Sequence, residues 1–159
     1  MKQIVVATDG SEHGRRAVEL ALDLAAPTGA ELTIVFVRHA PPPLLGAPYY
    51  QHSLSTELRH AEEVAAFAEA QARDCGVEAE VEVLEGEPAH RIVELARARE
   101  ADLIVVGSRG LGVVQSALFG SVSKTLVTQA QRPVLVVKEP SREQPQRDRA
   151  LVHNGSVLS

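Results

Sequence analysis

Short apolar runs alternate with longer segments of helical periodicity along most of this 159-residue chain. Four runs are continuously apolar and rich in β-branched residues, a pattern typical of strands buried on both faces of a parallel sheet. They occupy residues 4–7, 32–37, 103–106 and 134–137. A fifth segment, residues 77–84, alternates apolar with polar residues and predicts a strand with one wet face, at an edge of the sheet.

Amphipathic helices are predicted between these strands, where apolar residues recur at spacings of three and four. Pro27 and Gly29 are expected to end the first helix, and Gly76 the second. Pro88 suits the first turn of the third helix, where a missing N–H removes no helical hydrogen bond. The predicted helices cover residues 14–26, residues 55–75, a segment from residue 88 onward, and residues 121–131.

Residues 39–53 have an unusual composition, with four of the nine prolines and both tyrosines of the chain. Consecutive prolines do not fit a helix interior or a central strand, so this segment is expected to form a loop. Two interpretations stay open for it. It is either an inert surface connection or a lid or partner-binding segment in which Tyr49 and Tyr50 take part.

The alternation of strands and helices predicts one α/β domain over residues 1–138, with a five-stranded, mainly parallel sheet and helices on both faces. In the strand order 3-2-1-4-5, the direction of winding reverses between the first and fourth strands. Ligands bind outside the carboxyl ends of the strands at such a switch point. The turns after residues 7 and 106 would then meet in one crevice. Residues 139–159 are mostly polar and are expected to form a flexible tail.

Two glycine-rich turns flank one segment late in this domain. The first, Gly107-Ser108-Arg109-Gly110-Leu111-Gly112-Val113, follows the fourth strand, and the second, Gly120-Ser121-Val122-Ser123, opens the last helix. Glycine lets a polyanion approach backbone N–H groups closely, and a helix start adds free donors and the positive end of its dipole. The turns therefore favour a phosphate site. Simple turn formation, with Ser121 as an N-cap, is the alternative.

A turn with an acidic residue, Thr8-Asp9-Gly10-Ser11, follows the first strand. Asp9 or Ser11 can cap the next helix, while Gly10 allows the sharp turn. A carboxylate beside phosphate would repel it. As a ligand-binding residue, Asp9 would therefore face the base or the ribose, or hold a divalent cation. Capping alone and a ligand role are equally compatible with the sequence.

The spacing Gly-x2-Gly-x9-Gly-Ser, from Gly107 to Ser121, resembles the nucleotide-binding signature of the ATP-binding branch of the universal stress protein family. The opening IVVATDGSEHGRRAVELA, the strand LTIVFVRHA and the closing QRPVLVVK extend this resemblance in order over residues 2–138. It implies a Rossmann-like fold, similar to that of the adenine nucleotide alpha hydrolases. It also implies a regulatory or stress-response role and binding of ATP or another adenine nucleotide, with Mg²⁺ as an accompanying ion.

Roles for individual residues are implied by the same resemblance. The adenine would lie near Ala7, Asp9 and the backbone of Val37. The phosphates would lie on residues 107–113 and 120–123, where Arg109 could contact them. Similar proteins often dimerise through the last strand, and the apolar edge Val134–Val137 is suited to pairing with a second copy. The alternative is a monomer in which the tail after Glu139 folds back and covers this edge. The alternatives are a slow ATPase or nucleotidyl transferase that uses the same pocket, and a scaffold with an empty site.

Composition narrows the classes of partner. A net charge of −5 without a basic stripe argues against nucleic acid, and no apolar run is long enough to span a bilayer. The start lacks an apolar segment of the signal-peptide type, so a cytoplasmic protein is expected. The single Cys75 allows no internal disulfide and is expected to be buried. No catalytic pair emerges from the sequence, so binding is better supported than catalysis.

Overall fold

The computed structural model describes residues 1–42, 44, 46–109 and 119–138. The predictions for Gly110, Leu111, Gly112, Val113 and the tail at 139–159 therefore lie outside the described residues. Five strands form one sheet in the order β3-β2-β1-β4-β5, and every neighbouring pair is parallel. This confirms the predicted strand order. The strands are β1 (Gln3–Ala7), β2 (Glu31–Arg38), β3 (Ala79–Glu85), β4 (Leu103–Gly107) and β5 (Val134–Val137).

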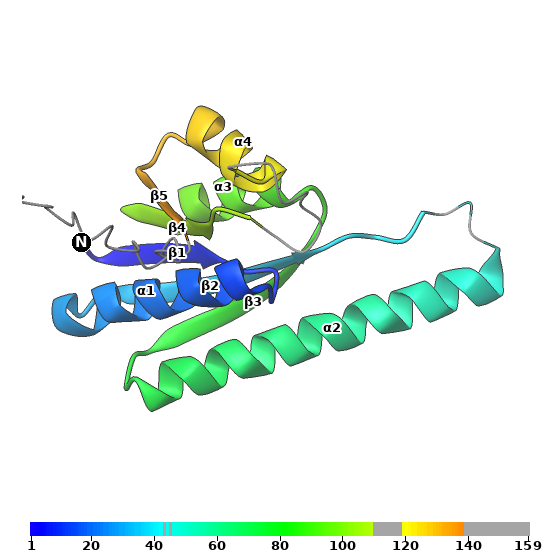
Figure 1. Ribbon diagram of the computed structural model, residues 1–159, viewed down its shortest axis with the longest axis horizontal. Helices are drawn as coiled ribbons and strands as arrows, with labels where there is room; N and C mark the ends of the chain where they lie inside the picture. Colours follow the sequence, from blue (N-terminus) through cyan, green and yellow to red (C-terminus); the bar gives the residue numbers. More distant parts are fainter. Residues whose placement is uncertain (43, 45, 110–118, 139–159) are drawn as a thin grey trace, which may run out of the picture.

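Helices cover both faces of this sheet. On one face lie α1 and α2, and on the other lie α3 and α4 (Figure 1). The predicted α/β architecture is thereby confirmed. The helices of the described residues are α1 (Glu12–Thr28), α2 (Ala47–Asp74), α3 (Pro88–Ala98) and α4 (Ser121–Gln129).

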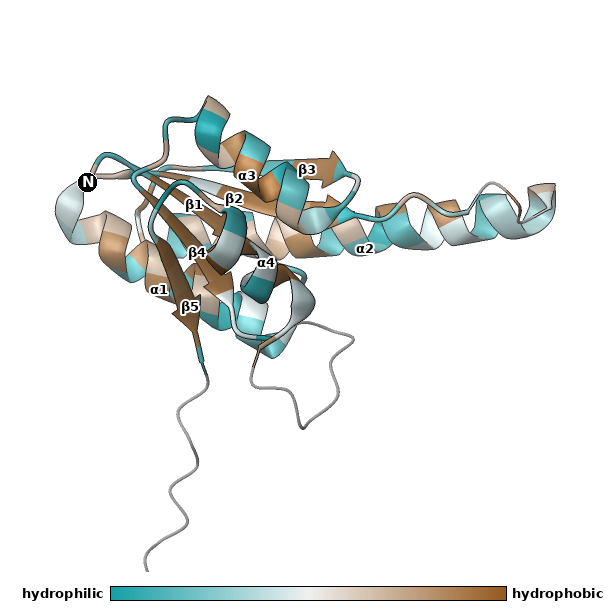
Figure 2. Ribbon diagram, turned by 90° about the horizontal axis from the view of Figure 1, so that it is seen from above, coloured by the Kyte–Doolittle hydropathy of each residue, from teal (hydrophilic) through white to brown (hydrophobic). Residues whose placement is uncertain are grey.

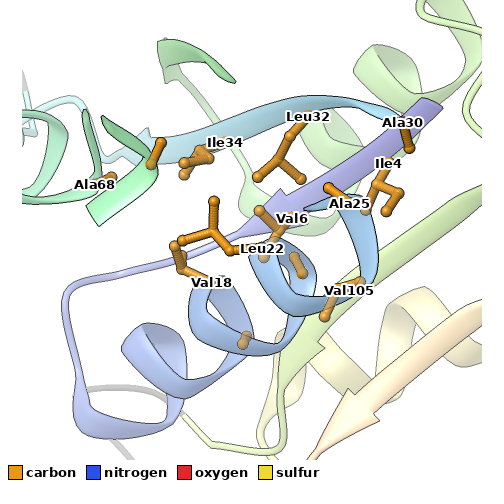
Figure 3. Packing of buried hydrophobic residues seen from close by; sticks show 13 residues of the cluster. Ile4, Val6, Val18, Leu22, Ala25, Ala30, Leu32, Ile34, Ala68 and Val105 are labelled. Carbon is orange, nitrogen blue, oxygen red and sulfur yellow. The ribbon is translucent and has the colours of Figure 1, made fainter. Parts of the chain in front are cut away.

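Successive residues of the central strands are buried on opposite faces, which explains why their sequences are continuously apolar. On β1, Ile4 and Val6 belong to the layer under α1, whereas Val5 belongs to the layer under α3. Figure 3 shows the first layer, in which Val18 and Leu22 of α1 pack with the side chains of β1 and β2. The side chains named here are all buried, namely those of Ile4, Val5, Val6, Val18 and Leu22. Each contributes about 1.5–3 kcal/mol to the docking of helices on the sheet.

Helix α2 begins earlier than predicted, at Ala47, and this confines the connection from β2 to residues 39–46. Pro48 lies in the first turn of the helix, where its missing N–H breaks no helical hydrogen bond. Tyr49 and Tyr50 are therefore helical residues, and the expectation of a loop over residues 47–53 was wrong. The N-terminal half of α2 projects beyond the sheet (Figure 1 and Figure 2).

Two other local expectations were also wrong. Helix α1 continues through Pro27 to Thr28 and ends only at Gly29, whose left-handed backbone (φ 64°) lets its N–H bond to the Ala25 carbonyl. Cys75 is exposed, because it follows the last turn of α2 as its C-cap and does not continue the buried stripe.

Asp102 joins the start of β4 to the start of β1. Its Oδ2 accepts hydrogen bonds from the backbone N–H groups of Lys2, at 2.5 Å, and Gln3, at 3.1 Å. These bonds lower the pKa of the Asp102 carboxyl below its ordinary value of 3.8. Desolvation of the carboxyl raises this pKa in part, whereas the positive charges of the N-terminus and of Arg132 lower it further.

Replacing Asp102 by asparagine is expected to make the protein less sensitive to acid. Because the folded-state pKa is depressed, the carboxylate stabilises the fold above 3.8, and this contribution is lost as the pH falls through the folded-state pKa. We therefore expect Asp102→Asn to melt below the parent protein near neutral pH and to approach it in strong acid. Thermal unfolding followed by circular dichroism at several pH values measures the difference in melting temperature between the two proteins. A difference that stays constant with pH would contradict this role.

Candidate functional site

A cavity of about 370 Å³ opens at the carboxyl ends of β1, β2 and β4. This volume lies within the range of small-molecule sites, and its position at the switch point is the one predicted for an open α/β sheet. The cavity brings together most of the site residues that the sequence suggested. Those that line it are Ala7, Asp9, Val37, Gly107, Arg109, Gly120, Ser121, Val122 and Ser123.

One wall of the cavity is apolar. It is formed by the ends of β1, β2 and β4 and by the first turns of α3. Ile92 and Val106 belong to it and are buried, with Ala7 and Val37 beside them. Such a wall suits a flat, weakly polar group, such as a nucleobase, because it offers apolar contact across a broad surface.

The turn after β1 forms the next part of the lining, and the structure decides which residue caps α1. Ser11 is the N-cap, since its Oγ accepts from the Gly14 N–H at 3.1 Å. Asp9 shapes the turn instead, because its Oδ1 accepts from the Ser11 N–H at 3.0 Å. Gly10 has the positive φ, 80°, that the turn requires. Asp9 therefore combines a local structural role with a place in the cavity wall.

Gly107 ends β4 and lies against the first turn of α1. A Cβ on Gly107 would stand 2.7 Å from both the carbonyl carbon and the carbonyl oxygen of His13. These are backbone atoms, so they cannot move aside without shifting the helix. The glycine at this position is thus required by the packing of α1 on β4, besides any close approach of a ligand.

The start of α4 also lines the cavity. Gly120 is the N-cap, and Ser121, which is exposed, is the first helical residue. The helix start supplies N–H donors and the positive end of the dipole, which together favour anions. Because Gly120 is the N-cap, the alternative in which Ser121 caps the helix is wrong.

The two other predicted serines are engaged within the protein. Ser123 is buried, and its hydroxyl lies 3.0 Å from the Gly120 carbonyl and 3.2 Å from the Ser108 carbonyl. Ser108 is buried behind the lining, where its N–H bonds to the carbonyl of Val137 and its carbonyl accepts from the Gly120 N–H. Ser108 and Ser123 thus hold the two turns together.

Sequence reasoning missed the residues that close the cavity at the β2 end. Glu57 and His60 of α2 line it together with Arg38 and His39. The His60 ring lies edge-on against Phe36, with ring centres 5.4 Å apart, and its Nε2 is 3.3 Å from the Asp9 carbonyl. The available signal was weak. Periodicity predicted an amphipathic helix here, but it did not indicate that the N-terminal half of this helix reaches the ends of the strands.

The charges of the lining are mixed. Asp9 and Glu57 are acidic, whereas Arg38 and Arg109 are basic. Arg38 is partly neutralised by an ion pair with Glu85 across the β2–β3 pair. Among the described residues, no group of three or more His, Cys, Asp or Glu side chains could hold a metal ion by itself.

The helices were also of interest as potential membrane spans, which need about 20 consecutive apolar residues. None of those in residues 1–42, 44, 46–109 and 119–138 is long and apolar enough to cross a bilayer.

Comparisons with known proteins extend this picture. A family model described as the universal stress protein family matches residues 1–138. The universal stress protein in the QAH/OAS sulfhydrylase 3′ region of Thermus aquaticus is 40% identical over 137 residues, which are 86% of this chain and 98% of that protein.

Solved structures show the same arrangement of strands and helices. The universal stress protein UspA from Lactobacillus plantarum is 27% identical with a TM-score of 0.74, over 86% of this chain and 97% of that one. A universal stress protein in complex with cAMP is 30% identical with a TM-score of 0.68, over 86% of this chain and 96% of that one. The universal stress protein from Archaeoglobus fulgidus in complex with dAMP is 27% identical with a TM-score of 0.65, over 87% of this chain and 98% of that one. The chain shares the α/β fold of these structures.

Proposed function

The chain belongs to the universal stress protein family, and from this premise we propose that it binds an adenine nucleotide, ATP first of all, in a regulatory, stress-response role. The observation that carries the proposal is one cavity that joins an apolar wall to the N-terminus of α4. A nucleotide needs both environments, one for its base and one for its phosphates. The relatives in complex with cAMP and dAMP support the same class of ligand.

In this proposal the base lies against the apolar wall, near Ala7 and Val37, with Asp9 toward the base or ribose. The phosphates lie between Gly107 and the start of α4, on Gly120 and Ser121. Arg109 is the basic residue at that end of the cavity and would offset the phosphate charge. The sequence signature adds residues 110–113, which lie outside the described residues.

A magnesium ion fits this site only together with the nucleotide. Mg²⁺ is usually held by one or two carboxylates and by the phosphates of its nucleotide. The described residues offer Asp9 in the cavity wall but no three-residue cluster. We therefore propose that Mg²⁺ enters with ATP and is held chiefly by the phosphates of the nucleotide.

The nucleotide content of the purified protein is the first test of this function. Extraction with acid followed by chromatography identifies any bound nucleotide, and calorimetric titration with ATP measures its affinity. Incubation of the loaded protein with Mg²⁺ then separates a binding protein, which leaves ATP intact, from a slow ATPase or nucleotidyl transferase. If neither the purified protein nor titration to millimolar ATP shows binding, the cavity is not a nucleotide site and a scaffold role is favoured.

We also propose that the protein acts in the cytoplasm, where its one cysteine stays reduced.

A further proposal is that two copies of the chain pair through β5. Among the described strands, β5 pairs only with β4, and its four residues are apolar and half-buried. An apolar strand with a free edge invites pairing with another strand. An antiparallel pair of β5 strands would give a two-fold dimer, which sedimentation of the full chain would detect.

A further inference from the structure

The end of β5 contacts residues on both sides of segment 110–118. On one side, the Ser108 N–H donates to the Val137 carbonyl at 2.8 Å. On the other, the Lys138 ammonium lies 4.7 Å from the centre of the Phe119 ring, as a cation–π contact. We call residues 108–109 and 119–120 the two stems. The edge strand is therefore attached to both stems of the turn that the sequence predicts to hold phosphate.

The two stems are also bonded to each other. The Gly120 N–H donates to the Ser108 carbonyl at 2.6 Å, and the Ser123 hydroxyl lies 3.2 Å from the same oxygen. Ser108 and Ser123 are only 3% and 2% exposed. Separating the stems would leave buried polar groups without partners, which is strongly unfavourable. The stems, the start of α4 and the end of β5 therefore behave as one unit.

The opposite edge of the sheet is anchored differently. All seven residues of β3 pair in register with β2. Arg99, just after α3, holds β3 through Glu80 at 2.7 Å and Glu82 at 2.6 Å. The shorter β5 pairs all four of its residues with β4, and the stems add contacts at its carboxyl end. Short edge strands open more readily than paired central ones, so opening of β5 should respond to the state of the stems.

We infer that nucleotide binding and the pairing of β5 with a second copy of this chain are coupled through the stems. The inference rests on the proposed function. Phosphates bound at Gly107, Arg109 and Gly120 hold the stems in place, and the stems hold β5 extended through Ser108 and Phe119. Such coupling is reciprocal, so pairing of two copies raises the affinity for nucleotide by the factor by which nucleotide strengthens pairing.

Hydrogen exchange on the full chain tests this coupling, after ATP binding has been measured separately by calorimetry. We expect saturating ATP to slow exchange about tenfold in a peptide covering residues 134–138, and less than about twofold in one covering residues 79–85. The β3 peptide is an internal control, because both strands are edges of one sheet. Sedimentation over a range of protein concentrations should show that ATP lowers the dissociation constant of the dimer.

Lys138→Met removes the cation that lies over Phe119 but keeps an apolar side chain of similar length. We expect this variant to bind ATP, while the slowing of exchange in β5 falls from about tenfold to about threefold. Lys124→Met is the matched control. Lys124 is an exposed lysine of α4 that does not line the cavity, and its replacement should leave the slowing unchanged.

The possible outcomes separate the two proposals. Bound ATP with unchanged exchange in β5, or with equal slowing in β3, would overturn the coupling and leave nucleotide binding established. A chain that stays monomeric with and without ATP would also overturn it. Failure to bind ATP at all would remove the proposed function and the coupling with it.

Discussion

Replacing Gly107 by alanine is expected to lower the melting temperature by about 4–8 °C, which corresponds to about 2 kcal/mol of stability. The added methyl group would stand 2.7 Å from the backbone carbonyl of His13 in the first turn of α1. Backbone atoms in a capped helix cannot rotate away, so α1 or β4 must shift. The shift would also displace the cavity lining, and ATP affinity should fall with stability. Thermal unfolding and calorimetry measure the two effects.

Gly46→Ala is the control for this substitution. Gly46 is the N-cap of α2 with a φ of −49°, and a Cβ there meets nothing within 4 Å. Its replacement should move the melting temperature by no more than about 2 °C. If Gly107→Ala melts with the parent protein, the packing of α1 on β4 does not require glycine, and only the approach of a ligand would explain this residue.

Gly107 shows where reasoning from sequence alone reaches its limit. A glycine directly after a buried strand predicts a turn in which a phosphate can approach the backbone. The structure adds a second reason, contact with His13 of α1. These two residues are far apart in sequence, and no local pattern indicates their contact. The glycine pattern thus located the cavity but could not separate the residues that bind from those that pack.

The strands were predictable because the central ones are buried on both faces, so their sequences are continuously apolar. The wet face of residues 77–84 indicated an edge strand, and the predicted order β3-β2-β1-β4-β5 is consistent with it. The turns after β1 and β4 then had to meet, since parallel neighbours end at the same edge of a sheet.

Helix α2 was the element that the sequence described least well. Pro48 resembles a helix breaker unless the start of the helix is already known. With the start misplaced, the reach of the helix to the strand ends could not be judged, and Glu57 and His60 were missed as lining residues. The direction of a helix relative to a sheet depends on packing over its whole length, which periodicity alone does not give.

Replacing Ser121 by glutamate is expected to weaken ATP binding about thirtyfold while leaving adenosine binding nearly unchanged. Ser121 is the exposed first residue of α4 and lines the cavity. A carboxylate there would repel phosphates placed at the helix N-terminus. It would not harm the fold, because an acidic residue in the first turn is favourable to the helix dipole. Calorimetric titration of both ligands, with thermal unfolding of the variant, measures these effects.

Thr125→Glu introduces the same charge one turn further along α4 and serves as the control. Thr125 does not line the cavity, and its hydroxyl bonds back to the Ser121 carbonyl at 2.8 Å. Its charge lies one turn further from the phosphates and in solvent, where the high dielectric weakens its effect, so ATP affinity should change by less than about threefold. If Ser121→Glu binds ATP as tightly as this control, the phosphates do not lie at α4. If it loses adenosine as well, the substitution has disturbed the cavity itself and not the phosphate end alone.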